Sequence, residues 1–187
     1  MSKVSAKDVA LLRKATGVGF SDCKAALEEQ NGDIEEAKIF LRKKGLANAE
    51  KKGGRVAAEG IIGIQITDDS KKAVMIEQNC ETDFVAKNDD FVAFVNKLAS
   101  AALSNDVQDA DKLMSEGDFE SQRQQLVLTL GENIQVRRIS HMAAKGEVIH
   151  YQHGTKIGVI VDVDGSKEVG KDIAMHIAAS NPTALSI

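Results

Sequence analysis

The sequence of 187 residues contains no tryptophan, one tyrosine, one proline and two cysteines. Aromatic residues make up 4% of the chain while hydrophobic residues make up 43%, so we expect a core of Val, Ile, Leu and Ala side chains. Cys23 and Cys80 are too few for a disulfide framework, and neither lies in a Cys-x-x-Cys or Cys/His spacing. We therefore predict that both cysteines are reduced and buried.

Long apolar runs are also missing. No stretch approaches the roughly 20 apolar residues that cross a bilayer, and the first residues, Met-Ser-Lys-Val-Ser-Ala-Lys-Asp, lack the apolar core of a signal peptide. The net charge of −4 combines a basic segment, residues 1–59, with an acidic remainder. A chain with this charge balance is not expected to bind nucleic acid. We predict a cytoplasmic protein without membrane or nucleic-acid partners.

Motifs for nucleotide binding and catalysis are absent. The sequence contains neither Gly-x-x-x-x-Gly-Lys-[Ser/Thr] nor Gly-x-Gly-x-x-Gly, so we expect no direct nucleotide binding. There is no Gly-x-Ser-x-Gly motif, and the four histidines lack a metal-binding spacing, so we expect no catalytic residues, no metal and no cofactor. A cysteine-dependent enzyme using Cys23 or Cys80 remains an alternative, which thiol alkylation would test.

Residues 1–45 have the pattern of three short helices. Apolar residues recur at helical spacing, and capping residues alternate with glycines. We expect the helices to begin at Ser5, Ser21 and Asp33 and to end at Gly17, Gly32 and Gly45. So small a bundle has a thin core, and its surface is better suited to binding another protein than to forming an active-site cleft.

A second region follows a linker at residues 46–59. Alternation in residues 62–66 and 74–78 predicts a hairpin, and Asn88 begins an amphipathic helix. Further helices are expected near 109–116 and 118–130, strands at 134–138, 147–152 and 157–163, and a last helix at 166–180. The sequence therefore predicts an α+β fold with domains at 1–45, 60–140 and 141–187. The repeated order of hairpin and helix gives weak support to an internal duplication.

Residues 77–88 place two apolar side chains, Phe84 and Val85, in a polar segment between the hairpin and the helix. One interpretation is a hydrophobic staple, in which Phe84 or Val85 fixes the entry to the following helix. The other is a tip on which Asp83 and Phe84 are presented to another protein. The pattern of residues alone favours the staple.

Four separated segments resemble the translation elongation factor Ts family. Residues 12–27 read Leu-Arg-Lys-Ala-Thr-Gly-Val-Gly-Phe-Ser-Asp-Cys-Lys-Ala-Ala-Leu and are similar to its amino-terminal signature. Residues 77–87, Glu-Gln-Asn-Cys-Glu-Thr-Asp-Phe-Val-Ala-Lys, resemble its second signature. Tyr-Gln-His-Gly at 151–154 and Ile-Ala-Met-His-Ile-Ala-Ala-Ser at 173–180 resemble later blocks. Four matches in order are more specific than any one short motif.

The resemblance implies a ubiquitin-associated-like three-helix bundle followed by a two-part core of antiparallel sheets and helices. It also implies a guanine-nucleotide exchange factor whose partner is the GTPase elongation factor Tu. Carried over by position, the residues near the partner's magnesium site would be Thr82, Asp83, Phe84 and Val85. Other partner contacts would be Arg13, Thr16, Gly17, Val18, Gly19, Phe20, Ser21, Lys24 and His153.

The sequence departs from the family pattern in two places. Phe20-Ser21 stands where many relatives have two methionines, and the chain lacks the coiled-coil insertion and carboxy-terminal segment with which the family usually continues. We expect a homodimer only where that region is present. The alternative function is a protein-binding adaptor that uses the helical bundle without any exchange activity.

Overall fold

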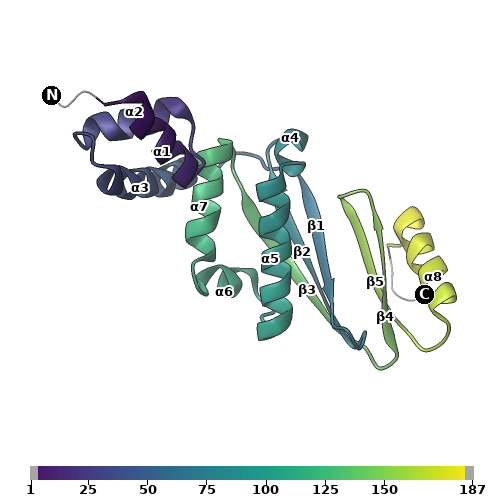
Figure 1. Ribbon diagram of the computed structural model, residues 1–187. Helices are drawn as coiled ribbons and strands as arrows, with labels where there is room; N and C mark the ends of the chain where they lie inside the picture. The colour runs from purple at the N-terminus through teal and green to yellow at the C-terminus, as the bar shows by residue number, and fades with distance from the viewer. Residues whose placement is uncertain (1–3, 184–187) are drawn as a thin grey trace. The chain divides into compact units, whose positions relative to one another are not determined.

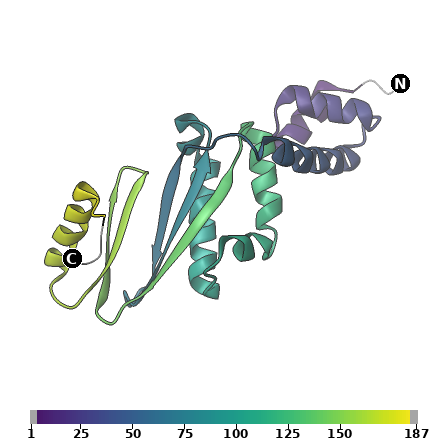
Figure 2. The ribbon, with the colours of Figure 1, turned by 180° about the vertical axis from the view of Figure 1, so that it is seen from behind.

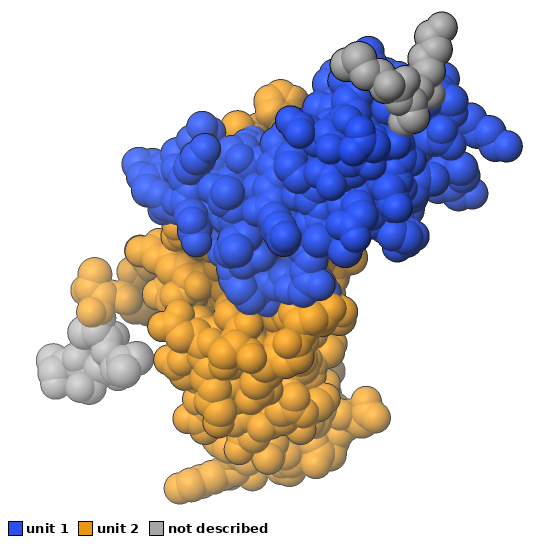
Figure 3. Space-filling model, turned by 90° about the vertical axis from the view of Figure 1, so that its left-hand side faces the viewer, with its two compact units in different colours: residues 1–56, 120–134 blue, residues 57–119, 135–187 orange. Residues whose placement is uncertain are grey.

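The computed structural model describes residues 4–183. The chain divides into two compact units, coloured separately in Figure 3. One unit contains the residues up to Val56 together with Glu120–Ile134, and the other contains Ala57–Phe119 and the residues from Gln135 onward. The sequence pattern had grouped residues 120–134 with the second region, whereas the structure groups them with the amino-terminal helices. The predicted α+β class with an amino-terminal helical bundle is confirmed.

The first unit is built on α1 (Ala6–Thr16), α2 (Phe20–Glu29) and α3 (Ile34–Lys52). As predicted, Ser5 caps α1 through its side chain, Gly17 ends α1 with φ of 70°, and Asp33 caps α3. The three helices, joined by two short loops, pack around one cluster of buried side chains. Its members are Val9, Leu12, Val18, Cys23, Ala26, Leu27, Ala37, Leu41 and Leu128.

Two predicted helix boundaries are wrong. The N-cap of α2 is Gly19, which has no side chain, and Ser21 lies inside the helix. The first helical hydrogen bond of α2 runs from the Cys23 N–H to the Gly19 carbonyl at 3.0 Å. The helix therefore begins two residues before Ser21, which cannot be its N-cap. Helix α3 also continues through Gly45 to Lys52. Gly45 is buried, and a Cβ there would lie 3.3 Å from the Gln124 carbonyl oxygen, so this glycine permits close helix packing instead of ending a helix.

Helix α7 (Phe119–Leu130) supplies that neighbouring backbone. The Gln125 side chain donates to the Thr16 carbonyl at 2.8 Å, and the Arg42 guanidinium donates to the Ser121 hydroxyl at 3.1 Å. Leu128 is 7% exposed and belongs to the core cluster of the bundle. The first unit is therefore a four-helix assembly whose last member comes from far along the chain.

We expect removal of residues 1–56 to destabilise α7, because Leu128 and Gln125 would lose their packing and hydrogen-bond partners. Trypsin cleavage at Arg123, within α7, should become about tenfold faster or more than in the whole chain, since local opening would cost less. Cleavage within residues 135–180 provides the internal control. An α7 that stayed equally protected would show that it folds independently of the bundle.

The second unit contains a three-stranded antiparallel sheet in the order β1-β2-β3. The strands are β1 (Glu59–Ile66), β2 (Lys72–Cys80) and β3 (Gln135–Ala143). Helix α5 (Asp89–Asn105), capped by Asn88 as predicted, lies along one face of this sheet (Figure 1). A Cβ on Gly63 would meet Val95 of α5 at 2.4 Å, so the helix approaches β1 closely. The short helix α6 (Ala110–Ser115) follows α5.

A hairpin of β4 (Glu147–His153) and β5 (Ile157–Val163) packs on the opposite face of the sheet. Gly158 of β5 makes this possible, because a Cβ there would lie 2.7 Å from Ile62 and 2.9 Å from Met75. Helix α8 (Lys167–Ser180) covers the far side of the hairpin, as seen from both sides in Figures 1 and 2. The order of hairpin and helix does occur twice, as the sequence indicated.

Candidate functional site

The segment that the sequence left open forms a single helical turn, α4 (Asp83–Ala86). The Thr82 hydroxyl accepts a hydrogen bond from the Val85 N–H at 3.4 Å and caps the amino end. The Lys87 N–H donates to the carbonyls of Asp83 at 3.2 Å and Phe84 at 3.3 Å and closes the other end. Since both ends of this turn are hydrogen-bonded, its side chains project in fixed directions.

The two apolar side chains of α4 have different surroundings. Val85 is 8% exposed and packs into the unit, so Val85 holds the turn in place as a staple residue would. Phe84 is 82% exposed and is presented to solvent. A largely exposed phenylalanine on an ordered turn is unusual for a residue that serves only the fold. The structure thus gives the anchoring role to Val85 and the presented position to Phe84.

Asp83 pairs with Lys87 one helical turn away, with Oδ2 and Nζ 2.7 Å apart. The hydrogen bond and charge of Lys87 lower the pKa of the Asp83 carboxyl, and the charge of Lys156 adds to this effect. Asp83 in turn raises the pKa of Lys87. The carboxylate therefore stays ionised at neutral pH, on the residue that precedes the exposed Phe84.

His153 is the last residue of β4 and is exposed. Its Nδ1 lies 3.2 Å from the Tyr151 hydroxyl, and the two rings are stacked with centroids 6.3 Å apart. The turn after His153 is joined to β1, because the Ile62 N–H donates to the Thr155 carbonyl at 2.7 Å. The Gln152 side chain also donates to the Ile62 carbonyl at 2.8 Å. Strand β1 thus supports both α4 and the turn that carries His153.

The remaining predicted contacts lie in the first unit, around the connection between α1 and α2. Most of their side chains are exposed, including Arg13, Ser21, Lys24 and Phe20, which is 50% exposed. Gly17 and Gly19 are exposed backbone positions, and Thr16 is half-buried. Val18 is fully buried in the core cluster, so its side chain anchors this connection to the core and cannot contact a partner directly. These residues share one segment, while α4 and His153 belong to the other unit.

The alternative cysteine chemistry finds little support. Neither cysteine takes part in a disulfide, and both are buried, as predicted. Burial raises the pKa of the Cys23 thiol, which keeps it protonated and weakly nucleophilic at neutral pH. Residues 4–183 contain no group of three or more His, Cys, Asp or Glu side chains placed to hold a metal ion. Over the same residues, no helix is long and apolar enough to span a membrane.

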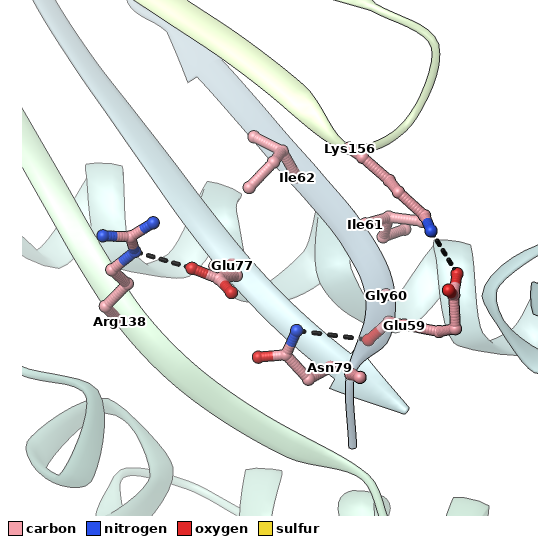
Figure 4. A pocket seen from close by; sticks show the side chains of 9 residues that line it. Glu59, Gly60, Ile61, Ile62, Glu77, Asn79, Arg138 and Lys156 are labelled. Atoms are coloured by element: carbon pink, nitrogen blue, oxygen red, sulfur yellow. Dashed lines mark hydrogen bonds and ion pairs between the residues drawn. The ribbon is translucent and has the colours of Figure 1, made fainter. Parts of the chain in front are cut away.

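A cavity of about 240 Å³ lies beside β1 and β2 (Figure 4). Burial of Glu77 would raise its pKa, but hydrogen bonds from Arg138 and Asn79 and the charges of Arg138 and Arg137 lower it below the usual value. Glu77 Oε2 lies 2.6 Å from Arg138 Nε on one side of the cavity. On the other side, Lys156 pairs with Glu59. The charges in this cavity are matched within the protein, so the cavity does not indicate a ligand.

Sequence reasoning did not single out the charged residues around α4. Lys87 had a local signal, because Asp83 and Lys87 are four residues apart and therefore lie on one side of a helical turn. Glu59 and Lys156 had none, since their pairing depends on how the hairpin of β4 and β5 folds against β1.

Comparison with known proteins shows the family. A model of the family described as "Elongation factor TS" matches residues 81–187. Elongation factor Ts of Hydrogenovibrio crunogenus is 49% identical over 98% of this chain and 64% of its own length. That of Acidithiobacillus ferrooxidans is 45% identical over 97% of this chain, and that of Halorhodospira halophila 49% over 98%. The chain covers 64 to 65% of these relatives' lengths. Because the matches extend over nearly the whole chain, the chain belongs to the elongation factor Ts family.

Proposed function

We propose that this chain is a guanine-nucleotide exchange factor for the translational GTPase elongation factor Tu, acting in the cytoplasm. The observation that carries the proposal is α4, where an ionised Asp83 and a largely exposed Phe84 stand on a turn anchored by Val85. Membership of the elongation factor Ts family supports the same function. The chain acts by binding its partner, without bond-making chemistry of its own.

The physical basis of the exchange is linkage between two binding events. A protein that binds the nucleotide-free partner more tightly than the GDP-bound partner weakens GDP binding by the same factor. Magnesium requires nearly octahedral oxygen ligands, so moving one ligand or its bound waters loosens both the ion and the phosphates. In this proposal the Phe84 ring enters an apolar crevice of the partner, and the Asp83 carboxylate disturbs the ligands around the magnesium ion.

The remaining contacts are found in each of the two units separately. Arg13, Lys24 and the connection around Phe20 meet the partner's nucleotide domain, and His153 meets another part of the partner. Phe20 is half exposed and supplies the apolar contact at this connection. Val18 and Val85 are buried, so they hold the neighbouring contact residues in place and do not touch the partner themselves.

Release of fluorescent GDP from purified elongation factor Tu tests the function directly. We expect the chain to accelerate release, and Asp83→Ala to reduce that acceleration about tenfold, the value of one charged hydrogen bond. Binding to nucleotide-free partner should weaken less than release. Asp172→Ala, at an exposed position on α8, is the matched control. A chain that binds the partner without accelerating release would be an adaptor instead.

A further inference from the structure

The turn between β4 and β5 is attached to the beginning of β1 by an ion pair. Lys156 extends from this turn and pairs with Glu59, the first residue of β1, as Figure 4 shows. The Glu59 oxygen that faces Lys156 is inaccessible to solvent, although the Lys156 side chain is 57% exposed. An ion pair with one shielded member is screened less by salt than a fully exposed pair.

The ion pair is one of three contacts that hold this turn on β1. The other two are the hydrogen bonds of Ile62, which donates to Thr155 and accepts from Gln152. The two hydrogen bonds use the backbone groups of Ile62, so they occupy the edge of β1 that does not pair with β2. His153 lies between Gln152 and Thr155, so its position is set by contacts on both sides.

Helix α4 packs against the same strand and shares the same charges. The charge of Lys156 contributes to the lowered pKa of Asp83, after the larger effect of Lys87, and the charge of Glu59 contributes to the raised pKa of Lys87. Acidic and basic groups therefore alternate from the α4 segment through the first residue of β1 to the turn: Asp83, Lys87, Glu59 and Lys156. This arrangement attracts the two segments toward one another at the beginning of β1.

We propose that the Glu59–Lys156 ion pair is a positioning contact, which holds the turn carrying His153 beside α4 so that His153 and Phe84 meet the partner as one surface. The inference rests on the proposed exchange function. Neither Glu59 nor Lys156 needs to touch the partner. Their effect is to reduce the number of orientations that the two contact residues adopt before binding, which lowers the entropy lost when the complex forms.

A double-mutant cycle separates positioning from direct contact. Glu59→Gln and Lys156→Met should each reduce the acceleration of GDP release about two- to fivefold, the range of a partly exposed ion pair. The double variant should lose no more than either single variant, because the interaction is already gone. Losses that multiply would show that each residue acts alone and would overturn the proposal, as would unchanged release in both single variants.

A second measurement does not depend on the partner. Hydrogen exchange of the Ile62 amide, which is bonded to Thr155, should become about two- to fivefold faster in each single variant and no faster in the double variant. The control is the exposed pair of Glu147 and Lys167 in the same unit, 3.2 Å apart, changed to Gln and Met. Unchanged exchange of Ile62 would overturn the positioning role. If the unmodified chain does not accelerate GDP release, the proposed function fails, and Ile62 exchange alone decides whether the ion pair positions the turn.

Discussion

Phe84→Ala should reduce both partner binding and GDP release by roughly 10- to 150-fold while leaving the melting temperature of the free chain nearly unchanged. Full burial of a phenylalanine side chain contributes about 1.5–3 kcal/mol, and each 1.4 kcal/mol corresponds to about a tenfold change in affinity. In the free chain the ring is 82% exposed, so its removal costs little packing. Exchange kinetics, partner titration and thermal melting measured on the same sample would test this expectation.

The matched control for Phe84 is Val56, which is equally exposed at 82% and lies outside the proposed contact surface. Val56→Ala should change neither binding nor exchange, which would exclude a general effect of removing exposed apolar area. A Phe84→Ala chain that melted much earlier, yet whose folded fraction exchanged GDP normally, would contradict the proposal. In that case Phe84 would serve the fold, as the staple interpretation holds.

Local signals were sufficient for most of the helices and strands. Side-chain caps at Ser5, Asp33 and Asn88 mark helix starts because a free oxygen satisfies the first backbone N–H groups, and this requires no knowledge of the fold. Strand alternation likewise predicted β1 and β2, because the alternating residues of each strand share a covered face: Ile62 and Ile64 of β1 face Gly158 of the β4–β5 hairpin, and Val74 and Ile76 of β2 are fully buried. The same reasoning failed at Gly45, where a glycine read as a stop is a site of close packing.

The candidate site was only partly accessible to sequence reasoning. The pattern placed Phe84 and Val85 together, but which of them is buried depends on the direction of a single turn, α4, that local propensity does not determine. The grouping of α7 with the first three helices was also hidden, because Gln125 and Thr16 are joined across 109 residues of sequence. Long-range pairs of this kind, including Glu59 with Lys156, follow from the packing of whole elements and leave no periodic signal.

Gly60 allows the close pairing of β1 with the end of β2 that precedes α4. Gly60→Ala should therefore destabilise the second unit by more than about 3 kcal/mol. Gly60 has φ of 148°, and a Cβ there would lie 2.1 Å from the Gln78 carbonyl oxygen and 2.8 Å from the Asn79 Cα. Both contacts are backbone atoms of the paired strand β2, which cannot move aside without breaking the pairing of Gly60 with Asn79. The Asn79 side chain also donates to the Glu59 carbonyl at 3.1 Å, so the beginning of β1 and the end of β2 would separate just before α4.

Gly165→Ala distinguishes this steric effect from backbone strain alone. Gly165 has φ of 156°, close to that of Gly60, but among the described residues no atom beyond its own chain neighbours lies within 4 Å of the position its Cβ would take. We expect Gly165→Ala to cost about 1 kcal/mol, the lower end of the range for an unfavourable backbone conformation. Chemical unfolding of both variants, followed by circular dichroism, gives the two free energies of unfolding. Equal losses would mean that β2 yields to the added methyl group and that α4 does not depend on close contact between β1 and β2.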